Sequence, residues 1–407
     1  MKKSLDILLL APWLPWPPHD GARIRIFETL RFLSQRHRVV LVAPTYSPAE
    51  RGHAAGLASM CASVHAVEVP DGTQARLRRL ATGVAAGAPP IQAFHRNRAM
   101  TERVRQLSAE IDFDIVQVEF SFLAHYLGAL RGKRRPKTIL SMHNVESMRF
   151  ERELKFSAWN PRRLVLLTDR YLFPRWEQRA VRSFDGVVAV SAAEAAWISR
   201  HAPHAALKVV PNGVDVEFFR PQSGTSGTQT VVFTGAMDYP PNIDAALWFA
   251  DAMLPLLRKQ SRQLRFVVVG RRPSPEVQAL ARHPDIQITG EVEDIRPYLA
   301  EALALVVPLR SGGGTRLKIL QAMAMARPVI STTLGAEGLT VTDNEHILIA
   351  DSPQQFVDAI VAVANSPLVA RRLAETGRQL ALAEYDWRQI LRGLEDLYQT
   401  VLAGDPP

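Results

Sequence analysis

The sequence of 407 residues is poor in cysteine and contains no long apolar run. Its only cysteine, Cys61, excludes an internal disulfide and a zinc site built on paired cysteines. No stretch approaches the roughly 18 consecutive apolar residues that span a bilayer, so we expect no transmembrane helix. The apolar start imitates a signal peptide, but Asp6 interrupts it and four prolines follow, which favours a buried first strand.

Clusters of metal ligands are missing as well. Histidine, aspartate and glutamate nowhere recur at the spacing of a metal site. Internal repeats and low-complexity tracts are also absent. We therefore expect a folded protein that uses no metal and no cofactor beyond its substrates.

Positive charge is in excess, with 49 Lys and Arg against 40 Asp and Glu. Nucleic acid, anionic lipid and phosphorylated small molecules are the partner classes that this charge suggests. No nucleic-acid recognition module is found, which excludes the first. Basic residues interleaved with Leu, Phe and Trp predict peripheral attachment of a cytoplasmic protein to the inner face of the membrane, and a solvated outer helix face is the alternative. These segments are 76–80, 131–137 and 162–176.

Apolar runs alternate with helix-period segments along the first half of the chain. Near-continuous apolar strands separated by helices favour a parallel sheet covered on both faces, in a doubly wound α/β domain. The predicted strands are 6–11, 38–43, 63–69, 115–119, 138–142, 186–190 and 207–210, and helical segments between them include 24–35 and 101–111.

The pattern breaks at 212–229, where Asn, Pro, Gly, Ser and Thr without a period predict a linker. The alternation then restarts, so 1–211 and 230–385 are predicted to be two α/β domains that face each other across a ligand-binding cleft. Residues 368–402 are predicted to be helical with a break near Tyr385-Asp386. The second set of strands is 230–234, 264–269, 286–290, 303–307, 329–331 and 346–350, with helical segments at 244–259, 275–281, 315–325 and 353–364.

Three loops join a strand to a helix through glycine, and each is a candidate anion site because helix N-termini offer unpaired N–H groups. They contain Gly21, Gly235 and the run Gly312-Gly313-Gly314-Thr315. The third is the strongest, because Arg316 and Lys318 follow it at a helix end where the dipole disfavours cations. Two cations there indicate a bound diphosphate, and a loop with solvated charges is the alternative. The Gly-Lys-Ser/Thr ending of a Walker-type loop is missing.

Together these loops resemble glycosyltransferase family 4, whose members are retaining, use nucleotide sugars and have the GT-B fold. The resemblance covers essentially the full length. It looks closest to bacterial sugar transferases associated with exopolysaccharide and exosortase systems. The matching motifs are 209–215, 234–235, 269–270, 290–294, 312–328 and 335–339.

The resemblance implies a role for each half of the chain. The N-terminal domain would bind the acceptor, the C-terminal domain would bind the nucleotide sugar, and the final helix at 386–402 would pack back on the first domain. His143 matches the active-site histidine that contacts the donor sugar. The leaving phosphate would take the proton of the acceptor, so no protein nucleophile is expected. The implied diphosphate-binding residues are Gly21, Gly235, Gly312, Gly313, Gly314, Thr315, Arg316 and Lys318, and the nucleoside-binding residues are Gly270, Arg271, Val292 and Gln321.

For two glutamates the sequence leaves open whether they contact a substrate. Glu119, at the carboxyl end of a strand, is interpreted either as an acceptor contact or as a structural hydrogen-bonding group. Glu337, between two glycines, is interpreted either as a sugar contact or as structural.

The chain departs from the family pattern at several positions. Gln321 stands where the family has the glutamate that holds the ribose, and Gly313 stands where it has the glutamate that contacts the sugar. Ala236 and Pro241 replace the Arg and Lys expected after Gly235, so the diphosphate charge falls mainly to Arg316 and Lys318.

We therefore predict a metal-independent, retaining glycosyltransferase with a UDP- or GDP-sugar donor and a glycan or lipid-linked acceptor, acting in exopolysaccharide or other cell-surface glycan synthesis. A nucleotide-sugar epimerase on the same fold is one alternative. A non-catalytic nucleotide-sugar-binding subunit is the other, motivated by the lost carboxylates.

Overall fold

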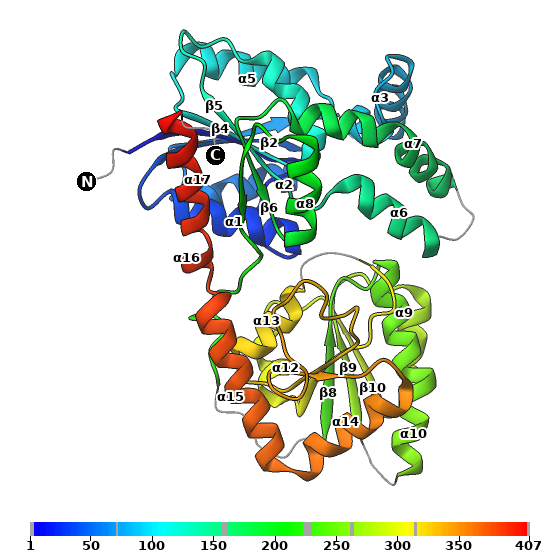
Figure 1. Ribbon diagram of the computed structural model, residues 1–407. Helices are drawn as coiled ribbons and strands as arrows, with labels where there is room; N and C mark the ends of the chain where they lie inside the picture. The colour runs from blue at the N-terminus through cyan, green and yellow to red at the C-terminus, as the bar shows by residue number, and fades with distance from the viewer. Residues whose placement is uncertain are drawn as a thin grey trace. The chain divides into compact units, whose positions relative to one another are not determined.

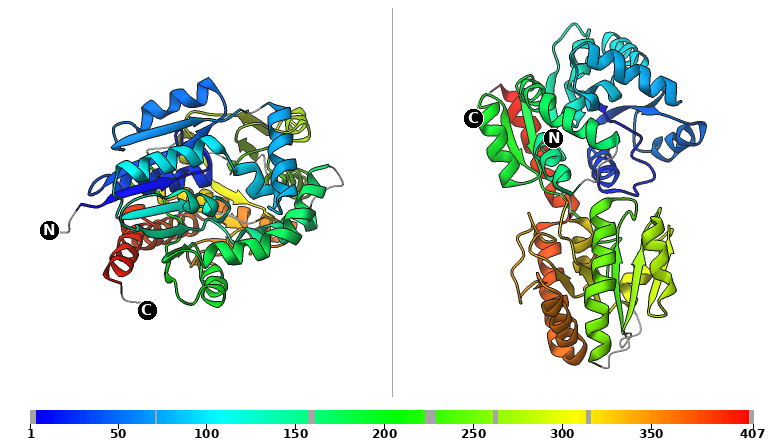
Figure 2. Two further views of the ribbon diagram at one scale, coloured as in Figure 1. Left: turned by 90° about the horizontal axis from the view of Figure 1, so that it is seen from above. Right: turned by 90° about the vertical axis from the view of Figure 1, so that its right-hand side faces the viewer.

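The computed structural model describes residues 4–70, 72–156, 161–222, 229–260, 264–312 and 316–404 (Figure 1). The chain divides into two compact units: the first unit is Met1–Pro211 with Ile390–Pro407, and the second unit is Asn212–Gln389. Each unit contains one parallel sheet with helices packed around it (Figure 2). The predicted pair of Rossmann-like α/β domains is thereby confirmed.

The inner strands of the first unit's sheet are buried on both faces, as their near-continuous apolar sequences require, and the edge strands are partly exposed. The order of the sheet is β3-β2-β1-β4-β5-β6-β7, so the direction of strand addition reverses between β1 and β4. Ligands of open α/β sheets bind at the carboxyl ends of strands beside such a reversal. The strands are β1 (Asp6–Leu10), β2 (Arg38–Thr45), β3 (Ser63–Glu68), β4 (Ile115–Glu119), β5 (Lys137–Ser141), β6 (Gly186–Ala189) and β7 (Ala206–Val209).

Short polar side chains begin several helices of the first unit. Asp20 accepts a hydrogen bond from the backbone N–H of Arg23, and Ser191 accepts one from that of Glu194. The helices are α1 (Gly21–Leu33), α2 (Pro48–Gly52), η1 (His53–Leu57), α3 (Thr73–Ala85), α4 (Pro90–His95), α5 (Arg98–Glu110), η2 (Ser121–Ala129), α6 (Glu146–Phe156), α7 (Pro161–Val181) and α8 (Ala192–His201).

The sheet of the second unit has the order β10-β9-β8-β11-β12-β13, with the reversal between β8 and β11. Its strands are β8 (Thr230–Thr234), β9 (Arg265–Val269), β10 (Ile286–Gly290), β11 (Ala304–Val307), β12 (Val329–Ser331) and β13 (Leu348–Ile349). Each predicted strand of the chain is found, with its ends displaced by two residues at most.

Most helices of the second unit start with a proline in the first turn, where its fixed φ suits a helix and its missing N–H costs nothing. Helix α13 has no such proline, and, as in α9, α10 and α12, no described side chain caps its N-terminus. The helices are α9 (Pro240–Trp248), η3 (Phe249–Met253), α10 (Leu254–Lys259), α11 (Pro275–Ala279), η4 (Leu280–Arg282), α12 (Arg296–Glu301), α13 (Leu317–Ala324), α14 (Pro353–Asn365) and α15 (Pro367–Glu384). None of the helices seen in the described residues combines the length and apolar character that crossing a membrane requires.

The last helices carry the chain back to the first unit. After α15 the chain breaks at Tyr385-Asp386, as predicted, and continues as α16 (Trp387–Ile390) and α17 (Arg392–Ala403). Helix α17 packs on β5, β6 and β7. Its separation from α16 at Leu391 is a second break that the sequence pattern did not indicate.

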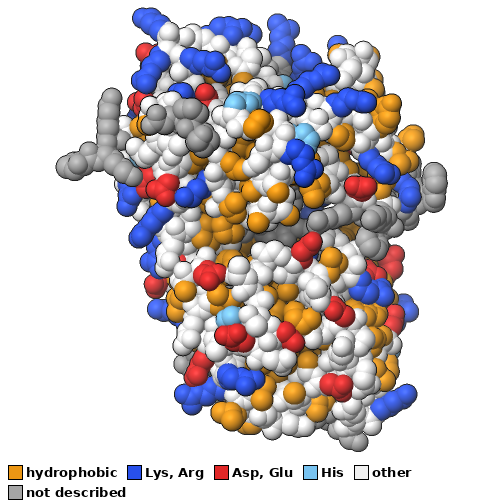
Figure 3. All heavy atoms as spheres, viewed as in Figure 1, with side chains coloured by type: hydrophobic (Ala, Val, Ile, Leu, Met, Phe, Trp, Pro, Cys, Tyr) orange, Lys and Arg blue, Asp and Glu red, His pale blue; other side chains and the backbone are white. Residues whose placement is uncertain are grey.

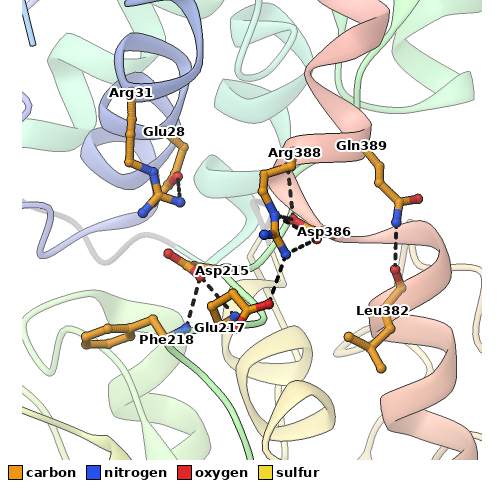
Figure 4. Close-up of polar contacts among 9 residues, drawn as sticks. All are labelled: Glu28, Arg31, Asp215, Glu217, Phe218, Leu382, Asp386, Arg388 and Gln389. Atoms are coloured by element: carbon orange, nitrogen blue, oxygen red, sulfur yellow. Dashed lines mark hydrogen bonds and ion pairs between the residues drawn. The ribbon is translucent and has the colours of Figure 1, made fainter. Parts of the chain in front are cut away.

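Residues 212–222 of the predicted linker are held within the second unit. Val214 forms a parallel bridge with Asp386, whose carboxylate contacts the guanidinium of Arg388 at 2.8 Å. The same guanidinium reaches Glu217 at 3.3 Å (Figure 4). These contacts join the start of the unit to its end. Residues 223–228 of the predicted linker lie outside the described residues.

Candidate active site

In the first unit, Glu119 and His143 meet at the carboxyl ends of β4 and β5. Glu119 is the last residue of β4 and pairs with Ser141, two residues before His143. The Nε2 atom of His143 lies 2.7 Å from Oε2 of Glu119, and both side chains are buried. The ring of Phe120 stacks on the imidazole with a centroid distance of 4.0 Å.

The charges of this pair follow from its surroundings. Burial lowers the pKa of His143, and the adjacent carboxylate offsets this only in part. Burial alone would raise the pKa of Glu119, but hydrogen bonds with His143 and Gln117 and the charge of Arg25 outweigh it and hold that pKa below its ordinary value. The pair is therefore a carboxylate beside a neutral imidazole near neutral pH.

In this structure both carboxylate oxygens of Glu119 are engaged within the first unit. Its Oε1 accepts a hydrogen bond from the Gln117 amide at 2.5 Å and its Oε2 faces His143. The side chain has no measurable exposure.

Gly21 is the first residue of α1, as expected for its loop. However, the Asp20 carboxylate takes the N–H of Arg23 at 3.0 Å and also binds the Arg23 guanidinium at 2.5 Å. Burial works against the charge of Asp20, but these contacts together hold its pKa below the ordinary value. An anion at this helix end would meet an N–H group that is already used and a negative charge.

In the second unit, three strands end in glycines that lie against one another. The N–H of Gly235, after β8, donates to the carbonyl of Val269, and the N–H of Gly270, after β9, donates to that of Gly290. A Cβ atom on Gly270 would lie 1.7 Å from the carbonyl oxygen of Gly235, so only glycine fits there. The side chain of Lys318 lies next to Gly235, at the carboxyl end of β8.

Lys318 has no carboxylate partner among the described residues. Its Nζ atom donates to Oδ1 of Asn242 at 3.1 Å and lies 4.3 Å from the centre of the Phe233 ring. A Cβ on Gly235 would approach this Nζ to 3.1 Å, which shows how tightly the loop encloses it. Desolvation by these groups and then the charge of Arg316 lower the pKa of Lys318 to about 7.

Arg316 precedes the first residue of α13 and is buried, with 7% of its surface exposed. Its guanidinium donates to the carbonyl of Leu334 at 2.6 Å and lies 3.6 Å from Oε2 of Glu337. Glu337 is therefore an ion-pair partner of Arg316 in this structure. Positive charge gathers at a helix end that is itself partially positive, and only Arg316 has a carboxylate nearby in the described part of the chain.

The remaining predicted site residues that the structure describes lie on α13 or in the loops that follow strands. Gly312 has a φ of 94° that favours glycine, and its position is confined by Pro241, whose carbon atoms would lie 2.9 Å from an added Cβ. Gln321 is half-buried on α13, one turn beyond Lys318, so the two share a helix face. Arg271 and Val292 are half-buried in the loops after β9 and β10. The predicted residues Gly313, Gly314 and Thr315 lie outside the described residues.

Several groups at the two sites were not predicted as site residues. Asn242 accepts the hydrogen bond of Lys318. Gln117 and Tyr398 extend the Glu119 pair inward. A signal existed for Gln117, because a polar residue two positions before Glu119 shares its strand face. In the regions that the structure describes, no three His, Cys, Asp or Glu side chains gather in a way that could hold a metal ion.

Comparisons with known proteins point to glycosyltransferases. Residues 19–218 match the family model described as Glycosyltransferase Family 4, and residues 228–366 match the model described as Glycosyl transferases group 1. An uncharacterised 44.6 kDa protein in the cps region of Klebsiella pneumoniae is 19% identical over 95% of this chain and 98% of its own. An MMP α-(1→4)-mannosyltransferase of Mycolicibacterium hassiacum is 27% identical over 62% of this chain and 63% of its own. The structure of Anabaena HepE in complex with UDP and glucose superposes with a TM-score of 0.66 at 15% identity, covering 97% of this chain and all of that one.

Proposed function

Because the chain belongs to glycosyltransferase family 4 and has the GT-B fold, we propose that this glycosyltransferase moves a sugar from a nucleotide-diphosphate sugar to a glycan or lipid-linked acceptor with retention of configuration. A UDP- or GDP-sugar is the proposed donor, and the UDP bound by HepE supports the former. Exopolysaccharide or other cell-surface glycan synthesis is the proposed process, and the likeness to the cps-region protein supports it.

The group around Lys318 carries this proposal. Lys318 and Arg316 stand at a helix end that no described side chain caps, beside the glycine-lined carboxyl end of β8, where a parallel α/β sheet binds its ligand. Since Lys318 has no carboxylate partner in the described chain, an anion bound there would supply the missing counter-charge. A diphosphate has the negative charge for this role, and its oxygens can accept hydrogen bonds from backbone N–H groups at the start of α13.

The proposed chemistry places negative charge where it is stabilised. As the glycosyl–phosphate bond breaks, charge builds up on the departing diphosphate, and Lys318 and Arg316 stabilise it. In the proposed mechanism the acceptor attacks from the face that the phosphate leaves, and the phosphate takes its proton. His143 contacts the donor sugar, so its loss affects turnover more than nucleotide binding.

Peripheral attachment to an anionic membrane is part of the proposal. Apolar side chains on α3 and α7 are well exposed, at 60% for Leu77, 69% for Leu164 and 72% for Tyr171. Arginines neighbour them on the same helices. Basic side chains are spread over the visible face of the first unit (Figure 3). Each cation near an anionic surface contributes about 1 kcal/mol.

A thermal-shift screen with UDP- and GDP-sugars, followed by product analysis with glycan and lipid-linked acceptors, tests the proposal. A transferase releases nucleoside diphosphate and retains the anomeric configuration in the product. Conversion of the donor without an acceptor and without release of nucleoside diphosphate would indicate an epimerase instead. Binding without turnover on any acceptor would favour the non-catalytic subunit, for which Gln321 on the face of Lys318 is the supporting observation.

A further inference from the structure

A chain of buried polar side chains runs from His143 to the C-terminal helix. Glu119 faces His143 through one carboxylate oxygen and Gln117 through the other, at 2.7 and 2.5 Å. The carbonyl oxygen of the Gln117 amide accepts a hydrogen bond from the hydroxyl of Tyr398 on α17. Gln117, Glu119 and Tyr398 have no measurable exposure, so water does not replace these contacts.

Each hydrogen bond in the chain determines which group donates and which accepts in the next one. A tyrosine hydroxyl that donates to Gln117 Oε1 turns the amide N–H groups toward Glu119. Both oxygens of Glu119 then act as acceptors, one from the amide and one from the imidazole. The charge of Arg25, whose guanidinium is held by the carbonyls of Val210 and Pro211 at 2.9 and 3.0 Å, favours the same carboxylate form.

The order of donors and acceptors in this chain determines which nitrogen of His143 carries the proton. A carboxylate at Nε2 requires the hydrogen on Nε2, which leaves the lone pair on Nδ1. Among the described residues no side chain or backbone group hydrogen-bonds Nδ1. Stacking on Phe120 further limits rotation of the ring, because the two planes lie 18° apart.

We propose that Gln117 and Tyr398 are positioning residues that hold Glu119 against Nε2 of His143, so that Nδ1 is the ring nitrogen that accepts a hydrogen bond from a sugar hydroxyl. The assignment rests on the proposed function for the identity of the sugar and on the hydrogen-bond chain for the orientation of the ring. Tyr398 lies on the helix that the chain enters on returning from the second unit, and it connects that helix to the histidine.

Two variants and one matched control test the proposal. Tyr398→Phe removes the hydroxyl that orients Gln117, and Glu119→Gln removes the carboxylate. Tyr126→Phe removes another buried tyrosine hydroxyl of the same unit, which contacts the backbone of His95 and Asn97 and has no part in this chain. Circular dichroism and thermal unfolding establish that each variant is folded.

The first measurement reports the tautomer without any need for activity. Protein labelled with ¹⁵N-histidine is examined by long-range ¹H–¹⁵N correlation at pH 7, and His143 is assigned by its loss in His143→Gln. The parent and Tyr126→Phe should show His143 as a single form protonated at Nε2. Glu119→Gln and Tyr398→Phe should show loss of that single form. A parent protonated at Nδ1, or variants indistinguishable from Tyr126→Phe, would overturn the proposal.

The second measurement is the rate of sugar transfer. By comparison with other residues that orient a catalytic group, kcat should fall about 100-fold in Glu119→Gln and about 5- to 10-fold in Tyr398→Phe, with donor KM within about twofold of the parent. A kcat in both variants equal to that of Tyr126→Phe would also overturn it. If the tautomer behaves as stated but the parent transfers no sugar, the positioning of His143 stands and the proposed function fails.

Discussion

Raising the pH from 6 to 8 should weaken the binding of a UDP-sugar about tenfold, because the ammonium of Lys318 loses its proton in this range. The pKa of Lys318 is lowered to about 7 by desolvation and by Arg316. A diphosphate beside Nζ favours the charged form, so binding raises this pKa and takes up a proton. The diphosphate of a UDP-sugar does not itself titrate in this range, which makes it a cleaner probe than UDP.

The size of the effect follows from the fraction of protonated lysine. With a pKa of about 7 in the free protein, about 90% of Lys318 is charged at pH 6 and about 10% at pH 8. If only the charged form contributes, the apparent Kd rises by about that ratio. Burial lowers the pKa of His143, which reduces the contribution of this residue to the trend.

Isothermal titration calorimetry with UDP-glucose in phosphate and in Tris measures both quantities. The difference in apparent enthalpy between the buffers should report uptake of about half a proton at pH 7 and about 0.9 at pH 8. Lys318→Met should bind more weakly at pH 6 and lose the pH dependence. Lys259→Met, which removes an exposed lysine of the same unit, is the matched control and should behave as the parent. The reasoning would be refuted if the affinity for UDP-glucose did not change between pH 6 and 8 and the apparent enthalpy of binding did not depend on the buffer.

Four further outcomes are expected. Arg316→Ala should weaken nucleotide-sugar binding by about 1–3 kcal/mol, since a charged hydrogen bond is lost, and calorimetry matching the parent would remove Arg316 from the site. His143→Ala should keep donor affinity in the same assay but lower kcat, and an unchanged kcat would contradict a contact with the reacting sugar. Gly270→Ala should lower the free energy of unfolding by about 1–3 kcal/mol, because its Cβ would lie 1.7 Å from the oxygen of Gly235. A thermal transition equal to that of the parent would show that the loop can move to accommodate the Cβ. Sedimentation with anionic vesicles should fall as salt rises, and no sedimentation at low salt would exclude membrane attachment.

The strands could be predicted because buried parallel strands have continuous apolar sequences flanked by turn residues. In β4 and β8, for example, the predicted and observed ends coincide, since β4 follows Asp114 and ends at Glu119, and β8 lies between Gln229 and Gly235. The break at Tyr385-Asp386 was also foreseen. The break at Leu391, between α16 and α17, was not foreseen, because the helical period continues through it. The resemblance to family 4 was carried by motif spacing, and the two family-model matches confirm it.

The partners of the site residues could not be predicted in the same way. Asn242 accepts the hydrogen bond of a lysine 76 positions away. Gln117 meets a tyrosine 281 positions later. The sequence gives no sign of these pairs, because contacts over such separations depend on which strands and helices become neighbours. Likewise, the Gly21 loop has the composition of an anion site, but Asp20 folds back onto its helix end.

By itself, then, the sequence determined the two α/β units, the glycines at the strand ends and the presence of basic residues before α13. Local patterns are sufficient for these, since burial on two faces and the lack of a Cβ are properties of single segments. Only the tertiary structure decided that Lys318 lies away from every described carboxylate and that Glu119 faces inward to His143. A charge or a proton position depends on all the groups that surround an atom, and folding alone brings those groups together.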